Sequence, residues 1–144
     1  MRPTAILETI LYAGDLDAAR AFYADVLGLV VYSEVKGRHI FFKLEQQMLL
    51  IFDPDATDAP PKPGALPVPR HGSRGPGHLC FSGTADEIEA WHRRLTETGV
   101  EIEADFTWPA GADDMRGRSI YFRDPAGNSI EIAEPRIWGL PEVR

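Results

Sequence analysis

The stretch RGRSIYFRDPAGNSIEIAEP, from Arg116 to Pro135, alternates polar and apolar residues on both sides of a turn sequence. This alternation has the period of a half-buried β-strand, so residues 119–123 and 129–133 are predicted to be strands. The DPAGN sequence between them favours a tight turn, because proline presets φ and because glycine and asparagine tolerate positive φ. The whole stretch is therefore expected to form a β-hairpin.

Within this hairpin, a carboxylate occupies an unexpected position. If Arg123 pairs with Ser129, Tyr121 lies directly opposite Glu131 on one face. The other face is predicted to join the core and consists of Ile120, Phe122, Ile130 and Ile132. A glutamate between two isoleucines is costly to bury unless it is ion-paired or bound to a metal. Glu131 is therefore the first candidate for a functional role.

The composition is that of an ordinary folded protein. A chain of 144 residues, with 44% hydrophobic and 26% charged residues, is long enough for one domain or for two small halves that share a core. The net charge of −7 argues against a nucleic-acid-binding surface, and no apolar run approaches the length of a membrane span. Cys80 is the single cysteine, so no internal disulfide is possible. With no basic–apolar signal pattern at the N-terminus, we expect a cytoplasmic protein.

The first half of the chain predicts a strand, a helix and three further strands. The first strand spans residues 5–13 (AILETILYA) and contains one acid, Glu8. Asp15 is a suitable N-cap, apolar residues recur at helical spacing over residues 16–26, and Gly28 is suited to follow the helix. Three short strands are then expected at 29–35, 39–44 and 48–52.

The same order of elements recurs in the second half. A strand is predicted at 77–82, and Thr84 and Glu87 form a capping box for the helix that Gly99 ends. A strand at 100–104 and the hairpin complete the unit. The predicted fold class is therefore α+β, with two βαβββ modules in tandem at 1–53 and 76–135 that form a single domain.

The segment between the modules, residues 54–75, is rich in proline and glycine and is expected to form a loop without helix or strand. Residues 136–144 are expected to form a C-terminal tail. Aligning the two modules sets Glu8 against His78 and Leu50 against Glu131.

Glu8, His78 and Glu131 thus stand on predicted strands, two of them at matching positions of the repeat. One imidazole and two carboxylates can form a divalent metal site with open positions for substrate. Each residue also has a plainer interpretation. Glu131 could be an edge-strand acid that faces water, His78 a hydrogen-bonded core histidine, and Glu8 the partner of an arginine in a metal-free pocket.

Three segments carry a resemblance to a known family: ILETILYAGDLDAARAFYADVLGLVV (6–31), GPGHLCFS (75–82) and RSIYFRDPAGNSIEI (118–132). Through them the chain resembles the vicinal oxygen chelate superfamily, which includes glyoxalases, bleomycin-resistance proteins and extradiol dioxygenases. The phrases FYADVLGL and DPAGNSIEI are the more specific marks. The resemblance implies that paired βαβββ modules curl into a cup-shaped mixed sheet around one divalent metal ion (Fe, Mn, Zn or Ni), and that the protein is a homodimer.

The resemblance also implies which residues bind the metal, and two of the positions involved differ from the usual family pattern. It places the metal ligands at Glu8, His78 and Glu131. A fourth ligand position, used by glyoxalases and epimerases of the group, falls on Leu50, which cannot ligate and so argues against a standard glyoxalase I. The dioxygenases and fosfomycin-resistance transferases usually have histidine at the position of Glu8, although 118–132 is similar to the fosfomycin-resistance branch.

Several other residues are candidates for contacts with a substrate. Tyr121, opposite Glu131, is a candidate for catalysis, and Leu50 would form an apolar wall beside the ion. Trp108 could line a pocket, Arg118 could neutralise a substrate carboxylate, and Arg74, with Arg70 and His71 in the loop, could bind an anion. For these residues the plainer interpretations are core packing and solvated surface charge.

The leading functional hypothesis is a metal-dependent enzyme that acts on a small oxygen-chelating substrate, of isomerase, lyase or thiol-transferase type. The metal would act as a Lewis acid, and Glu8 or Glu131 as a general base. One alternative is a ferrous extradiol-type dioxygenase, and another is a metal-free drug-binding protein of the bleomycin-resistance type. Neither a nucleic acid nor a membrane is expected as a partner.

Overall fold

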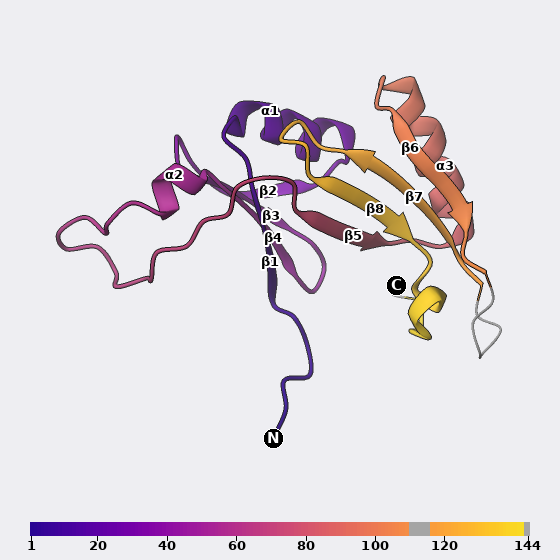
Figure 1. Ribbon diagram of the computed structural model, residues 1–144, viewed down its shortest axis with the longest axis horizontal. Coiled ribbons are helices and arrows are strands. Elements are labelled where there is room, and N and C mark those ends of the chain that lie inside the picture. The colour runs from indigo at the N-terminus through magenta and orange to yellow at the C-terminus, as the bar shows by residue number, and fades with distance from the viewer. Residues whose placement is uncertain (110–115, 143–144) are drawn as a thin grey trace. The chain divides into compact units, whose positions relative to one another are not determined.

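The computed structural model describes residues 1–109 and 116–142, and the chain divides into two compact units, Met1–Gly77 and His78–Arg144 (Figure 1). Each unit contains a four-stranded sheet with helices. The predicted α+β class with two tandem βαβββ modules is confirmed. That the two sheets together form a cup stays a prediction. In the part of the chain that the structure describes, no helix is long and apolar enough to cross a membrane.

The sheet of the first unit has the strand order β1-β4-β3-β2, with β1 parallel to β4 and the other neighbours antiparallel. The elements of this unit are β1 (Glu8–Tyr12), α1 (Leu16–Arg20), η1 (Ala21–Val26), β2 (Val30–Val35), β3 (His39–Lys43), β4 (Met48–Phe52) and α2 (Pro54–Thr57). The side chain of Asp15 caps α1 as predicted, because Oδ1 accepts a hydrogen bond from the Ala18 backbone N–H at 2.9 Å. The helix predicted over 16–26 is continuous but changes from α to π geometry at Ala21.

Side chains alternate between the two faces of this sheet. One face packs against the helical segment, where the rings of Tyr23 and Phe42 have centroids 5.6 Å apart. The almost fully buried sheet residues of that face are Leu11, Ile40, Phe42, Leu49 and Ile51. The opposite face therefore carries the side chains of Glu8 and Leu50.

The sheet of the second unit repeats this topology with the order β5-β8-β7-β6, and β5 is parallel to β8. Its elements are β5 (His78–Ser82), α3 (Ala85–Glu97), β6 (Ile102–Thr107), β7 (Arg118–Arg123), β8 (Ser129–Ala133) and η2 (Pro135–Trp138). Both hydrogen bonds of the predicted capping box at Thr84 and Glu87 are present. Ile88 and Leu95 of α3 are fully buried, so α3 covers one face of this sheet.

The hairpin of β7 and β8 has the predicted register: Arg123 pairs with Ser129, and Tyr121 pairs with Glu131. Its core face is confirmed, with exposures of 0% for Ile120, Phe122 and Ile130 and 2% for Ile132. The turn is held by Asp124, whose carboxylate accepts hydrogen bonds from the backbone N–H groups of Ala126 and Asn128 at 2.9 and 2.8 Å. Gly127 adopts φ +86°, which the turn requires.

The strand registers confirm the repeat alignment. Glu8 pairs with Met48 as His78 pairs with Ser129, so Glu8 and His78 occupy equivalent positions. Leu50 pairs with Ile10 on one side and with Phe41 on the other. Glu131 pairs in the same way with Cys80 and Tyr121, so Leu50 and Glu131 occupy equivalent positions.

Three predicted boundaries were wrong. The strand expected at 5–13 begins at Glu8, the first residue that pairs with β4. The strand expected at 100–104 lies at Ile102–Thr107, because a register shift between Ile102 and Ala104 carries the pairing on to the start of β7. Residues 54–75 do contain a helix, α2, because proline is favourable in a first helical turn and Asp53 caps it through the Asp55 N–H at 2.9 Å.

Candidate functional site

An imidazole and a carboxylate meet on neighbouring parallel strands of the second unit. His78 Nε2 on β5 lies 3.3 Å from Glu131 Oε2 on β8. The other ring nitrogen, Nδ1, lies 3.1 Å from the carbonyl oxygen of Ser129. Because a carbonyl oxygen only accepts hydrogen bonds, Nδ1 carries a proton. In the neutral ring Nε2 then presents a lone pair to a carboxylate oxygen, so the contact requires a proton or a metal cation between the two atoms.

The carboxylate of Glu131 has one oxygen without a hydrogen bond. Glu131 is 5% exposed, and its Oε1 atom has no partner among the residues that the structure describes. A buried carboxylate oxygen in this state is costly and calls for a bound ion or water. An unpaired hard oxygen beside an imidazole lone pair fits a divalent metal ion, so these two residues are suited to be part of a metal site.

A row of aromatic rings crosses the same face of this sheet. The ring of Tyr121 is near-parallel to that of His78, with centroids 6.3 Å apart and planes at 18°. On its other side Tyr121 is near-parallel to Phe106, at 5.8 Å and 6°, and Phe106 meets Trp108 at 5.0 Å and 64°. The row therefore connects the His78–Glu131 pair with the end of β6. Sequence reasoning missed Phe106, because the strand that carries it was predicted to end at residue 104, whereas β6 extends to Thr107.

Two protonated groups flank the carboxylate. Burial, reinforced by the neighbouring Glu131, raises the pKa of Tyr121 to about 12. Partial burial and the same carboxylate raise the pKa of the Cys80 thiol to about 12. At neutral pH the Tyr121 hydroxyl is therefore a hydrogen-bond donor, and the Cys80 sulfur is not a thiolate nucleophile.

The remaining predicted ligand, Glu8, belongs to the first unit. It is exposed on β1, on the strand face that also carries Ile10. Leu50 is 6% exposed and lies between Ile10 and Phe41 in the register. Among the described residues, no group of three His, Cys, Asp or Glu side chains is gathered closely enough to hold a metal ion.

The predicted anion-binding residues of the loop are engaged within the first unit. Arg70 is paired with Asp58 at 3.0 Å, and Arg74 is paired with Asp55. His71 Nδ1 lies 2.8 Å from the Tyr12 hydroxyl. These contacts attach the loop to β1 and α2, and they occupy the guanidinium groups that were expected to face a ligand.

Arg118 lies on the helix-covered face of its sheet. Its guanidinium makes a bidentate pair with Asp105 on β6, at 2.8 and 2.7 Å, and contacts Glu89 on α3 at 2.8 Å. Alternation along β7 places Tyr121 on the opposite face. The side chain of Arg118 thus attaches α3 to the sheet, and the substrate-binding role predicted for it stays a prediction.

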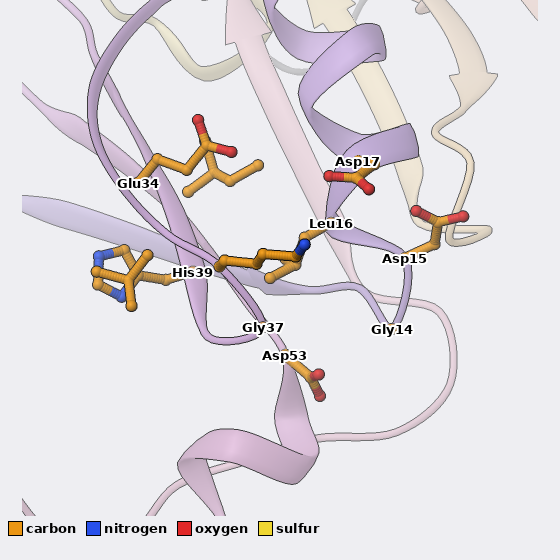
Figure 2. A pocket seen from close by; sticks show the side chains of 11 residues that line it. Gly14, Asp15, Leu16, Asp17, Glu34, Gly37, His39 and Asp53 are labelled. Carbon is orange, nitrogen blue, oxygen red and sulfur yellow. The ribbon is translucent and has the colours of Figure 1, made fainter.

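A hollow of about 560 Å³ lies in the first unit among the β1–α1 turn, the β2–β3 turn and the start of α2 (Figure 2). Asp15 and Asp53 line it, and both carboxylates already accept helix N–H groups. Glu34, another lining residue, is paired with Arg20 at 3.3 Å. Three of the four acids that line this hollow, Asp15, Glu34 and Asp53, therefore have structural roles.

The family follows from comparison with known proteins. A family model described as the Glyoxalase/Bleomycin resistance protein/Dioxygenase superfamily matches residues 5–132. The chain belongs to this superfamily. The resemblance found in the sequence is thereby confirmed.

Three proteins that are similar to the chain differ in how much they share with it. A lactoylglutathione lyase from Agrobacterium tumefaciens is 43% identical, with a TM-score of 0.89, over 97% of this chain and 100% of that one. Virulence protein STM3117 from Salmonella typhimurium is 26% identical, with a TM-score of 0.69, over 93% and 98% of the two chains. The metallothiol transferase FosB of Shouchella clausii (strain KSM-K16) is 34% identical over 55 residues, which span 38% of this chain and 36% of that protein.

Proposed function

We propose that this glyoxalase-superfamily chain is a metal-dependent enzyme that binds a small substrate through two neighbouring oxygen atoms. The observation that carries the proposal is the pair of His78 and Glu131, with a lone pair on Nε2 and an orphaned Oε1 on one sheet face. Metal-ligating histidines commonly donate their second ring N–H to a backbone carbonyl, as His78 does to Ser129. The pair is thus already oriented for a cation.

Glu8 is proposed as the third ligand. The support is its position, since the register of β1 makes Glu8 the equivalent of His78 in the other unit. An imidazole with two carboxylates suits Fe, Mn, Zn or Ni. Leu50, the equivalent of Glu131, offers no ligand atom, so that position would be left to substrate or water.

The side chains of the site then have distinct roles. The bound metal would supply Lewis acidity toward a substrate oxygen. Tyr121, opposite Glu131, donates a hydrogen bond to a substrate oxygen. Glu8, exposed on β1, is proposed to remove a proton from the substrate as a general base, and Glu131 is the second candidate for that step.

The proposed reaction type rests on the proteins to which the chain is similar. Similarity to a lactoylglutathione lyase over the whole chain favours lyase or isomerase chemistry, and the short match to a metallothiol transferase keeps thiol transfer as the next option. A ferrous dioxygenase is a further alternative. A metal-free binding protein is the second candidate function, favoured by Leu50 at a ligand position and by the alternative of a protonated His78 paired with Glu131.

The test is metal binding by protein purified without an affinity-nickel step. We expect about one divalent ion per chain by elemental analysis, and we expect Glu131→Gln to weaken Mn²⁺ binding at least about tenfold in a calorimetric titration. Glu101→Gln, an equal chemical change at an exposed residue outside helices and strands, is the matched control. Equal Mn²⁺ affinity of wild type and Glu131→Gln would refute the metal site and leave the binding-protein candidate.

A further inference from the structure

We propose that His39 makes the first unit acid-sensitive, and that mild acid releases the loop segment around His71 from the sheet of that unit. The proposal starts from a buried histidine whose polar atoms are unsatisfied. His39, on β3, is 9% exposed, and neither of its ring nitrogens has a hydrogen-bond partner among the residues that the structure describes. A neutral imidazole leaves one N–H without an acceptor in such a place, and a protonated imidazole leaves two.

The ring of His39 is enclosed by other rings. It is stacked on Phe41, with centroids 3.9 Å apart and planes at 14°, and it meets Phe52 at 5.8 Å and 68°. Phe52 in turn meets His71 of the loop at 4.9 Å and 79°. The cross-strand partners of His39 are Val35 and Phe52, which are both apolar. The described ring contacts and strand partners of His39 are therefore hydrocarbon, and the ring cluster continues from β3 to the loop.

The charged groups around His39 do not compensate a positive charge on its ring. The titratable or charged side chains on the elements packed around it are Arg38 and Lys43 before and on β3, Glu34 and Lys36 on β2 and in the turn after it, Asp53 after β4, Tyr12 on β1, and His71 in the loop. Glu34 pairs with Ile40, so its side chain lies on the other face of the sheet. The Asp53 carboxylate accepts the Asp55 N–H as the cap of α2. A proton on His39 therefore adds an uncompensated charge to an apolar place.

The direction of the pH effect follows from this environment. Burial, and after it the positive charge of Arg38, lowers the pKa of His39. An exposed histidine takes up a proton near pH 6.5, so at about pH 5 its protonated form exceeds its neutral form about thirtyfold. A histidine whose pKa is lowered by folding leaves the folded state at full stability above about pH 6.5 and destabilises it progressively below that value. The thirtyfold ratio is thus the upper limit of the effect at pH 5.

The loop is the element that is most easily displaced from the ring cluster. His71 is attached by the Tyr12 hydroxyl, 2.8 Å from Nδ1, and by its own N–H, which donates to the Thr57 carbonyl oxygen at 3.2 Å. The ion pairs of the two neighbouring loop arginines join side chains that are 53–76% exposed, so they contribute little. By contrast, β3 is paired with β2 on one side and with β4 on the other. A local opening that hydrates His39 should therefore lift His71 from Phe52 before the strands separate.

The experiment measures amide exchange of the full chain at about pH 7 and about pH 5, with each rate expressed as a protection factor so that the intrinsic pH dependence of exchange cancels. In the wild type we expect the protection factor of the His71 amide to fall about tenfold between the two conditions. His39→Phe keeps a ring in the cluster but cannot take up a proton, so the same protection factor should change less than about twofold. His92→Phe, on α3 of the second unit, is the matched control and should respond like the wild type.

Every other titratable group of the first unit is unchanged in His39→Phe, so a response that arises from His71 or from a carboxylate would survive in this variant. A fall in protection that survives in His39→Phe, or that is lost in His92→Phe, would therefore overturn the proposal. Equal protection of the His71 amide at both pH values in the wild type would also overturn it.

An NMR titration of the wild-type histidine rings gives a test that does not depend on the folding of a variant. We expect the ring of His39 to take up its proton only in the pH range in which the His71 amide loses protection. A His39 ring that becomes protonated while the His71 amide stays protected would show that the folded unit tolerates the charge, and the proposal would then be wrong.

Discussion

Replacing Arg118 with methionine tests whether this residue stabilises the fold or serves a ligand. The guanidinium joins three elements through Asp105 and Glu89, and the side chains of Arg118 and Asp105 are 25% and 31% exposed. Exposed ion pairs contribute about 0.2–1 kcal/mol, and breaking fully buried ones costs about 3–5 kcal/mol. A bidentate, partly buried pair lies between these limits, so Arg118→Met should lower the free energy of unfolding by about 1–2 kcal/mol at pH 7.

The loss should depend on pH with a defined sign. The hydrogen bonds and charge of Arg118 lower the pKa of Asp105. A carboxyl group with a lowered pKa in the folded state contributes stability that is present above its unfolded value of about 3.9 and lost as the pH falls toward the folded value. Wild type and Arg118→Met should therefore differ in urea denaturation at pH 7 and converge below about pH 4.

The control is Arg123→Met. Arg123 is paired with Glu103 at 2.9 Å, but the two side chains are 44% and 41% exposed, so its loss should cost only a few tenths of a kcal/mol. A double-mutant cycle of Arg118→Met with Asp105→Asn should return a coupling of about 1 kcal/mol. If Arg118→Met unfolds like the wild type at pH 7 but loses ligand affinity, Arg118 serves the ligand and the structural role is wrong.

Three further predictions concern the metal, the loop and the assembly. Leu50→Glu should tighten Mn²⁺ binding at least about tenfold in a chelator competition, because a third carboxylate adds charge and a hard oxygen. Leu50→Met is the control. If Leu50→Glu binds Mn²⁺ no more tightly than wild type, Leu50 does not face the ion. Tyr12→Phe should speed amide exchange around His71 about fivefold, because it removes one hydrogen bond of about 1 kcal/mol. Tyr32→Phe, the control at a residue that is 67% exposed, should leave this exchange rate unchanged. Exchange near His71 that is as slow in Tyr12→Phe as in wild type would mean that other contacts hold the loop. We also predict a homodimer, and sedimentation at monomer mass across micromolar concentrations would contradict it.

The hairpin was the most predictable part of the fold because its determinants are local. The DPAGN turn fixes the pairing of Arg123 with Ser129, and alternation then assigns every side chain to a face. The same alternation places Arg118 on the face of Ile120 and Phe122. Sequence reasoning did not apply that rule to Arg118, and the contacts of its side chain with Asp105 and Glu89 on the helix side were therefore not predicted.

Contacts between distant segments could not be predicted at atomic detail. The sequence placed His78 and Glu131 on strands of one module, but the tautomer of His78 depends on the Ser129 carbonyl, which only the parallel register of β5 and β8 brings near. The row of aromatic rings depends on the register shift in β6 between Ile102 and Ala104, after which Phe106 pairs with Ser119. A bulge changes which residues share a face of the sheet, and no local pattern in residues 100–107 predicts this bulge.

The two modules place side chains of opposite character at one equivalent position. Leu50 is 6% exposed and Glu131 is 5% exposed, and each lies opposite an aromatic residue, Phe41 or Tyr121. Burial to this degree stabilises a leucine, but it costs a carboxylate several kcal/mol unless a cation or proton compensates its charge. The need for a compensating cation or proton therefore arises in the second module, where Oε1 of Glu131 has no hydrogen-bond partner among the described residues. It follows that Glu131→Leu, which copies the first module, should stabilise the metal-free protein while it abolishes metal binding. Separate thermal melts with and without Mn²⁺ would measure both effects, and a metal-free protein destabilised by Glu131→Leu would refute this account of the buried charge.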